Sequence, residues 1–194
     1  SKKVVANNEA TSSNTANLSS KEERALKGFF FDALKEKALG NNEKAIELFA
    51  KCIEIDANHA ASYNEMSILY DREDNYILAL NQSKKAVEYN NTNKWYLLQL
   101  ALMQKKSLKY EDALVSYEKL TELDPKNLDF LISLSEAYMY NSKPEKAADV
   151  FDKIQNITGE NEEITIQKHR LYLQAGKTDK AIAEIQKLVD NKPN

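Results

Sequence analysis

The residues of this chain that could do acid–base, nucleophilic or metal chemistry are few and widely separated. Two histidines, His59 and His169, lie more than a hundred residues apart, and Cys52 is the single cysteine. A zinc site needs several His, Cys or carboxylate ligands at short, defined spacings, and no such set accompanies either histidine. Glu162 and Glu163 are adjacent, so on a helix their carboxylates do not face each other and cannot act as an acid pair.

Known catalytic signatures are also missing from the sequence. It contains no glycine-rich phosphate loop, no G-x-S-x-G elbow and no H-E-x-x-H segment. We therefore expect a protein that is not an enzyme and that holds no cofactor and no metal ion.

Composition narrows the class of protein further. The chain has 194 residues, a net charge of −3, and only four glycines and three prolines, which favours helices over turn-rich structure. Its basic residues are dispersed, and the pairs Lys84–Lys85 and Lys105–Lys106 lack the surrounding basic stripe that a phosphate backbone requires. We therefore expect no nucleic-acid partner. No apolar run approaches the roughly 18 residues that span a bilayer.

The strongest pattern is an internal repeat. Five alanines stand 34 residues apart without insertion or deletion, at Ala45, Ala79, Ala113, Ala147 and Ala181. The residue four positions after each alanine is mostly large and apolar, and the residue twelve positions before it is small in four of the five copies. A unit of this length cannot bury its apolar face alone, so neighbouring copies must stack into a solenoid with a continuous core.

This pattern resembles the tetratricopeptide repeat, a pair of antiparallel helices with small residues where the helices cross. The resemblance implies an all-α, right-handed α-solenoid of five helix-turn-helix repeats within a domain of residues 20–194. The repeats are assigned to residues 26–59, 60–93, 94–127, 128–161 and 162–194. Asp32 and Glu36 in the first copy, and Lys168 and His169 in the fifth, depart from the family pattern, as is usual for terminal repeats that lack one neighbour.

Periodicity and helix-end signals place the individual helices. Ser20 with Glu23 has the spacing of a capping box, which predicts a first helix over 21–39 that is longer than the others. Asn161 and Thr178 are candidate N-caps of later helices. The remaining helices are expected near 43–56, 60–73, 76–90, 94–107, 110–123, 128–141, 144–157, 162–175 and 178–190.

Residues 1–19 differ in kind from the rest of the chain. Asn, Ser, Thr and Ala dominate there and no helical or strand period survives, so we expect a disordered leader that acts as a tether. A leader of this kind before a helical repeat domain is similar to tetratricopeptide-repeat lipoproteins of the Bacteroidetes-type cell envelope after loss of the signal and anchoring cysteine. The resemblance favours the bacterial envelope or periplasm over the cytoplasm, with membrane contact only through a lipid tether at the missing N-terminus.

In the tetratricopeptide family, the first helix of each pair lines the inner, concave face of the superhelix. On that geometry the groove carries Phe30, Phe31, Leu34, Ile68, Trp95, Leu98, Leu102, Ile132, Met139 and Tyr140. Aromatic anchors in a recess commonly dominate binding energy, and Trp95 is the foremost candidate. We therefore expect a non-catalytic scaffold that holds an apolar or helical peptide segment of a partner protein in this groove.

Two alternatives stay open at this point. The side chains of the groove could instead pack together internally, in a structural module or in part of a longer repeat chain. The last helix carries an apolar stripe formed by Ala181, Ile182, Ile185, Leu188 and Val189. Such a stripe suits a homo-oligomer or a further repeat. The carboxylate clamp of chaperone-binding members is not reproduced, because its places in repeats one to three fall on residues such as Phe30, Glu65 and Trp95.

Overall fold

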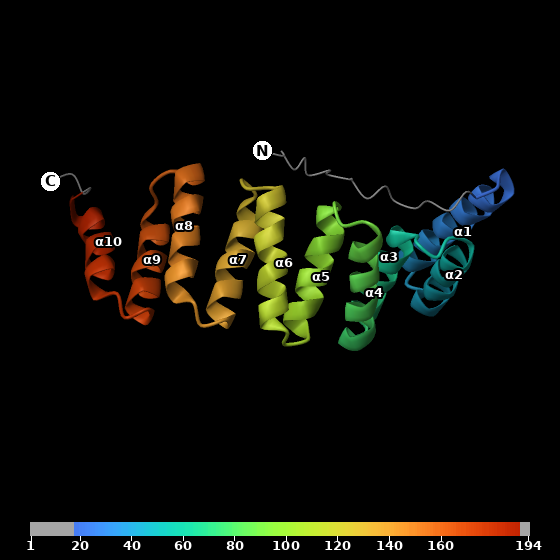
Figure 1. Cartoon of the computed structure of the whole chain (residues 1–194), viewed down its shortest axis with the longest axis horizontal. Helices are drawn as coiled ribbons and strands as arrows, with labels where there is room; N and C mark the ends of the chain where they lie inside the picture. Colours follow the sequence, from blue (N-terminus) through green and yellow to red (C-terminus); the bar gives the residue numbers. More distant parts are fainter. Residues whose placement is uncertain (1–17, 191–194) are drawn as a thin grey trace, which may run out of the picture.

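The computed structural model describes residues 18–190, which form ten helices and no strand. The helices follow one another along the long axis in sequence order, from α1 at one end to α10 at the other (Figure 1). They are α1 (Ser20–Ala38), α2 (Asn42–Ile55), α3 (Ala60–Arg72), α4 (Tyr76–Tyr89), α5 (Lys94–Lys106), α6 (Tyr110–Leu123), α7 (Leu128–Tyr140), α8 (Pro144–Thr158), α9 (Glu162–Gln174) and α10 (Thr178–Asp190).

The predicted fold class, an all-α solenoid of helical hairpins, is confirmed. Each helix begins and ends within one residue of its expected range, and α1, with 19 residues, is the longest of the ten that the structure describes. Residues 1–17 of the expected leader and residues 191–194 of the expected last repeat lie outside the described residues.

One residue with a left-handed backbone makes the turn inside each helical pair. These residues are 34 apart and have positive φ angles: Gly40 (82°), Asp74 (56°), Leu108 (59°), Ser142 (56°) and Gly176 (69°). The left-handed region costs a residue with a side chain about 1–2 kcal/mol, whereas glycine escapes this penalty. Leu108 is the least suited occupant, because its large side chain has no polar atom with which to stabilise the turn.

The small residues that define the repeat lie where the two helices of a pair cross. All five periodic alanines are at most 2 % exposed. Ser135 Oγ donates a hydrogen bond to the carbonyl oxygen of Ala147 at 3.3 Å. His169 Nδ1 lies 2.8 Å from the carbonyl oxygen of Ala181, the same contact one repeat later. His169 departs from the family pattern, yet its ring, protonated at Nδ1, makes the bond that a serine makes in the fourth repeat.

Apolar side chains join each hairpin to the next. One cluster of buried residues runs from Ala79 in α4 to Ile154 in α8, so three successive repeats share it. Phe49 belongs to a second cluster between α1, α2 and α3, and Tyr172 to a third between α8, α9 and α10. Each hairpin therefore buries its apolar side against its neighbours, as a repeat protein requires.

The first helix begins one residue earlier than expected. Its capping box is formed by Ser19 and Glu22 instead of Ser20 and Glu23. Glu22 N donates to Ser19 Oγ at 3.3 Å, and Ser19 N donates in return to Glu22 Oε2 at 2.8 Å. Both pairs of residues have the three-residue spacing of a capping box, so spacing alone could not separate them.

The two candidate N-caps near the C-terminal end behave differently. Asn161 caps α9 as predicted, because its Oδ1 accepts a hydrogen bond from Glu163 N at 2.7 Å. Thr178 is itself the first residue of α10, so its prediction as an N-cap was wrong. The carbonyl oxygen of Lys177 already accepts the first helical hydrogen bond, from Ala181 N at 3.0 Å.

Candidate functional site on the odd-numbered helices

The odd-numbered helices share one exposed side. Positions 2, 6, 9 and 13 of each repeat lie within a narrow arc, because a helix turns about 100° per residue. We call this surface the odd-helix face, and none of its residues is fully buried. Its members are Lys27, Phe31, Leu34 and Ala38 on α1, Ala61, Glu65, Ile68 and Arg72 on α3, Trp95, Gln99, Leu102 and Lys106 on α5, Asp129, Ser133, Glu136 and Tyr140 on α7, and Glu163, Gln167, Arg170 and Gln174 on α9.

Polar contacts between successive odd-numbered helices hold the first four repeats of this face in register. We call them the cross-repeat ladder, with the rungs Lys37–Glu65, Ser67–Gln99, Asp71–Lys106 and Lys105–Glu136. Gln99 Nε2 donates to Ser67 Oγ at 3.1 Å, and Lys105 Nζ lies 3.3 Å from a carboxylate oxygen of Glu136. Lys105 and Lys106 form an isolated basic pair in the sequence. They connect α5 to two different helices, α7 and α3.

Five of the predicted site residues are exposed on or beside this face. Phe31 is 70 % exposed, Trp95 60 %, Tyr140 52 %, Ile132 45 % and Leu34 37 %. Single exposed apolar side chains are ordinary, but a series of them on successive helices marks a surface that another molecule can cover.

The other five predicted site residues are half-buried, and four of them, Phe30, Leu98, Leu102 and Met139, pack against the buried apolar clusters. The Phe30 ring packs against Phe49 with 5.5 Å between ring centroids, and edge-on against His59 at 5.2 Å. The remaining half-buried members are Ile68, Leu98, Leu102 and Met139. Leu98 and Leu102 also contact the central apolar cluster. Some of the predicted groove residues therefore pack internally, and the exposed surface is narrower than the set of ten.

Tyr140 is held in place by a second aromatic ring that the sequence analysis did not single out. Its ring stacks on Tyr110 at 4.8 Å with an interplanar angle of 4°, and Asn141 Nδ2 donates to Tyr110 O at 2.9 Å. Next to the two rings lies an open depression of about 550 Å³, which Leu108 also lines. The sequence does contain one indication of this depression. Leu108 is a large apolar residue at a turn position that carries Gly, Asp or Ser in the other repeats.

Exposed apolar side chains also occur on the even-numbered helices. Ile77 on α4 is 76 % exposed and Val115 on α6 is 65 % exposed. These residues were not among those predicted, and they lie on the helices opposite to the odd-helix face. They provide matched controls for any test of that face.

The charges of the odd-helix face vary along the solenoid. Lys27 on α1 and Arg72 on α3 are exposed cations that make no ion pair within residues 18–190. Asp129 on α7 and Glu163 on α9 are exposed carboxylates, equally without an ion pair in the described part of the chain. Position 2 of the face therefore carries a cation in the first repeat and carboxylates in the fourth and fifth, while Arg170 adds an exposed cation on α9.

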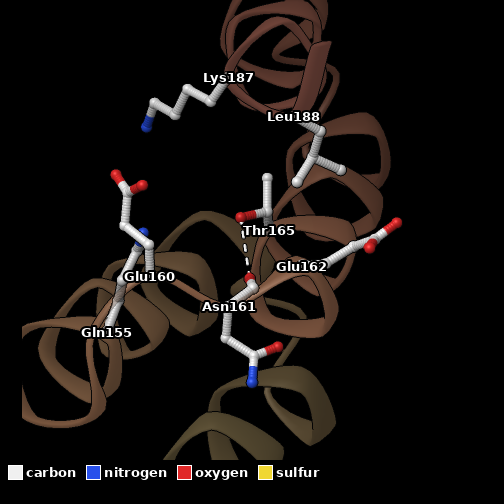
Figure 2. A pocket seen from close by; sticks show the side chains of 7 residues that line it. All are labelled: Gln155, Glu160, Asn161, Glu162, Thr165, Lys187 and Leu188. Carbon is white, nitrogen blue, oxygen red and sulfur yellow. Dashed lines mark hydrogen bonds between the residues drawn. The ribbon is translucent and has the colours of Figure 1, made fainter. Parts of the chain in front are cut away.

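A pocket of about 280 Å³ lies between α8, α9 and α10 (Figure 2). Thr165 forms part of its wall, and the side chains of Lys187 and Glu160 point toward each other beside it (Figure 2). The residues equivalent to Thr165 in the four earlier repeats are all large: Phe29, Tyr63, Leu97 and Leu131. The space is left because a threonine side chain is too short to fill it, and the lining offers neither a metal-binding set nor a catalytic pair.

Lys168, on the same helix as Thr165, is a buried cation with 2 % of its side chain exposed. Its Nζ lies 2.5 Å from Asp152 Oδ1, 3.1 Å from Glu184 Oε1 and 3.2 Å from Gln155 Oε1. Burial favours the neutral amine, but the hydrogen bonds to Asp152 and Glu184 outweigh burial and raise the pKa of Lys168. Burial likewise opposes ionisation of Glu184, but hydrogen bonds from Lys187 and Lys168 lower its pKa. Lys168 thus links α8, α9 and α10, which gives its departure from the family pattern a structural reason.

Metal ligands and reactive groups do not gather in the described residues. Across residues 18–190, no group of three or more His, Cys, Asp or Glu side chains is arranged to hold a metal ion. Cys52 is fully buried, and burial raises the pKa of its thiol, which keeps it in the less reactive protonated form. None of the described helices has the length and apolar character needed to cross a bilayer.

Comparison with known proteins agrees with the helical-repeat architecture. Residues 36–59 match the family model of the tetratricopeptide repeat. No curated protein sequence is significantly similar to the chain. Among solved structures, MamA is similar with a TM-score of 0.71 and 17% identity, over 87% of this chain and 92% of that chain. YrrB, described as a TPR protein with an unusual peptide-binding site, is similar with a TM-score of 0.70 and 16% identity, over 89% of this chain and 93% of that chain.

Identities of this size show a shared fold and nothing finer. The family match covers the end of α1 and all of α2, and the 34-residue period carries the same hairpin through the remaining repeats. The match to one repeat, the 34-residue period and the fold shared with these structures agree with a solenoid of helical hairpins of the tetratricopeptide type.

Proposed function

We propose that this protein is a non-catalytic interaction scaffold whose odd-helix face holds an apolar or helical segment of a partner protein. The observation that carries the proposal is the exposure of large apolar side chains along that face, above all Phe31 on α1 and Trp95 on α5. The cross-repeat ladder fixes the helices that carry them. A surface ordered in advance loses little conformational entropy when a partner binds.

The energy available at this surface is sufficient for a specific contact. An indole side chain buries about 150–250 Å² when fully covered, and Trp95 has 60 % of its surface exposed. At about 25 cal/mol per Å², covering the exposed part of Trp95 contributes about 3 kcal/mol to binding. The peptide-binding site named for YrrB supports the same use of the fold in this chain.

Affinity capture with surface-matched variants tests the proposal. The face variant carries Phe31→Asp and Trp95→Asp, and the control variant carries Ile77→Asp and Val115→Asp, four exposed positions divided between odd- and even-numbered helices. We expect the control to capture the same proteins as the wild type and the face variant to lose them, with equal thermal stability for both. Loss of capture by the control alone would place binding on the even-numbered helices.

A second candidate function is self-association through α10. Ile182 is 59 % exposed and Val189 is 60 % exposed on this helix, so part of the predicted apolar stripe faces solvent. Covering such a stripe with a second copy would remove it from water. We expect sedimentation at increasing concentration to show dimers that the double substitution Ile182→Asp and Val189→Asp abolishes. A monomer at every concentration would exclude this candidate.

We also propose a location in the bacterial cell envelope, where a lipid tether would precede the described helices. The composition of residues 1–19 and its resemblance to envelope lipoproteins support this location. Fractionation of cells that express the full-length natural gene product tests it, and recovery of the protein in the cytosolic fraction alone would contradict it.

A further inference from the structure

The first three repeats of the odd-helix face carry an apolar row at one repeat position. Position 9 is Leu34 in the first repeat, Ile68 in the second and Leu102 in the third, and Phe31 and Trp95 stand beside this row. In the fourth and fifth repeats the same position becomes charged, as Glu136 and Arg170. The apolar row at position 9 is therefore confined to α1, α3 and α5.

Cations without ion pairs border this apolar row. Arg24, Lys27 and Lys35 are exposed on the side of α1 that carries Phe31, and Arg72 is exposed at the end of α3. None of the four makes an ion pair with another described residue. By contrast, Glu65, the one carboxylate that belongs to the face in these repeats, is paired with Lys37. Lys27 and Arg72, which belong to the face itself, therefore offer cations without ion pairs to a ligand that lies along the apolar row, although the carboxylates Glu23 and Glu73 are exposed beside them.

We propose that repeats one to three bind an amphipathic helical segment of another protein, and this inference rests on the function proposed above. The apolar stripe of that segment is bordered by Asp and Glu. The apolar stripe covers the row from Leu34 to Leu102, and the acidic borders face Lys27 and Arg72. The carboxylates Asp129 and Glu163 in the later repeats repel an acidic segment, so they confine it to the first three.

Charge distinguishes this occupant from the other candidates. Residues 1–17 of this chain carry Lys2 and Lys3 but only one acidic residue, Glu9, so their charge has the same sign as the borders of the apolar row. The exposed side of α10 carries both signs, as in Asp179 and Lys180, so α10 of a second copy offers no uniformly acidic border. A nucleic-acid backbone would match the cations but would leave the apolar row exposed to water.

Two synthetic helical peptides test the inference. Both share one leucine stripe, and the positions that flank the stripe are all glutamate in one peptide and all lysine in the other. Trp95 is the single tryptophan of the chain and lies beside the apolar row, so its emission reports binding without a label. Exposed ion pairs are weak singly, and about four of them together give the glutamate peptide a roughly tenfold preference, which should fall as salt is added.

Charge-reversal variants supply the matched control. The double substitution Lys27→Glu and Arg72→Glu should remove or invert the preference for the glutamate peptide. Lys84→Glu and Lys119→Glu reverse two exposed lysines of even-numbered helices and should leave the preference unchanged. All variants should keep the wild-type melting temperature, because none of these four residues is buried or ion-paired within the described structure.

The outcomes separate this inference from the function on which it rests. Equal binding of both peptides with a response of Trp95 would overturn the acidic preference and leave the scaffold function standing. Preference for the lysine peptide, binding of neither peptide, or tighter binding of single-stranded oligonucleotides than of the glutamate peptide would each overturn the inference. Loss of capture by the control variant with Ile77→Asp and Val115→Asp would instead overturn the assignment of the odd-helix face.

Discussion

Replacing Lys168 by leucine measures how strongly the buried ion cluster stabilises the fifth repeat. Leu100 and Leu134 occupy the equivalent position in the third and fourth repeats, so leucine suits the site in size. The substitution leaves Glu184, whose side chain is 7 % exposed, with Lys187 as its remaining cation. Breaking a buried ion pair from one side costs about 3–5 kcal/mol.

The lower end of that range applies to this cluster. Asp152 is 47 % exposed and can be hydrated when Lys168 is removed, and Lys187 still contacts Glu184 at 2.8 Å. We therefore expect Lys168→Leu to lower the free energy of opening α9 and α10 by about 3 kcal/mol. Hydrogen exchange of these two helices is the appropriate assay, because a repeat protein can open locally and a global unfolding curve need not be two-state.

A double substitution provides the decisive comparison. Val150 is the fourth-repeat counterpart of Glu184, so Lys168→Leu with Glu184→Val copies an apolar pair that the chain already uses. With both charges gone, we expect a loss of no more than about 1 kcal/mol relative to the wild type. Lys153→Leu, at an exposed lysine of α8 without an ion pair in the described residues, is the control. A single variant as stable as the wild type, or a double variant that loses the sum of both single losses, would refute the reasoning.

Acid sensitivity adds a second readout of the same cluster. The pKa of Glu184 is lowered in the folded state, so its contribution is complete above the ordinary value of 4.5 and is lost as the pH falls through the lowered value. In Lys168→Leu one of the hydrogen bonds that lower this pKa is gone. The variant should therefore lose less stability than the wild type between neutral and acidic pH, as followed by hydrogen exchange of α10.

Three further substitutions test separate features of the structure. The fully buried Tyr117 hydroxyl has no partner among the described residues, and burial raises the pKa of Tyr117 to about 12. Tyr117→Phe should raise the unfolding free energy by about 1 kcal/mol. Tyr138→Phe loses a 2.7 Å hydrogen bond to Glu118 and should lower the unfolding free energy by about 1 kcal/mol. The opposite order of urea midpoints would contradict this expectation. Thr165→Leu should fill the pocket beside α10 and raise the free energy of opening α9 and α10 by about 1 kcal/mol, which slows their hydrogen exchange. Faster exchange would show that the space cannot accept the larger side chain. Leu108→Gly should raise the melting temperature because it removes the left-handed penalty of about 1 kcal/mol, and no change would show that the turn is not strained.

The helices were predictable because the repeat itself acts as an alignment of the chain with its own copies. Equivalent positions, read 34 residues apart, placed every helix of the described region within one residue of its observed bounds. One error occurred where two adjacent residues fit the same rule. Ser19 and Ser20 are each followed three residues later by a glutamate, and only the backbone geometry selects the earlier pair.

The candidate site was less predictable, because the position of a residue within its repeat does not determine how its side chain packs and how far it is exposed. Phe30 and Phe31 are adjacent, yet one packs against the core and the other is 70 % exposed. Lys168 was interpreted as an irregularity since its partners lie 16 residues away on each side, at Asp152 and Glu184. The space beside Thr165 could have been recognised from the sequence, because the other four copies carry large residues at that position.

The cross-repeat ladder gives the solenoid an elasticity that varies along its length. Its rungs join α1 to α3, α3 to α5 and α5 to α7, and no such rung joins α7 to α9 in the described part of the chain. Three of the four rungs are ion pairs, which weaken as salt screens them. The odd-numbered helices should therefore resist bending over the first four repeats and lose part of that resistance at high ionic strength, whereas the last repeat is joined to the fourth through Lys168 instead.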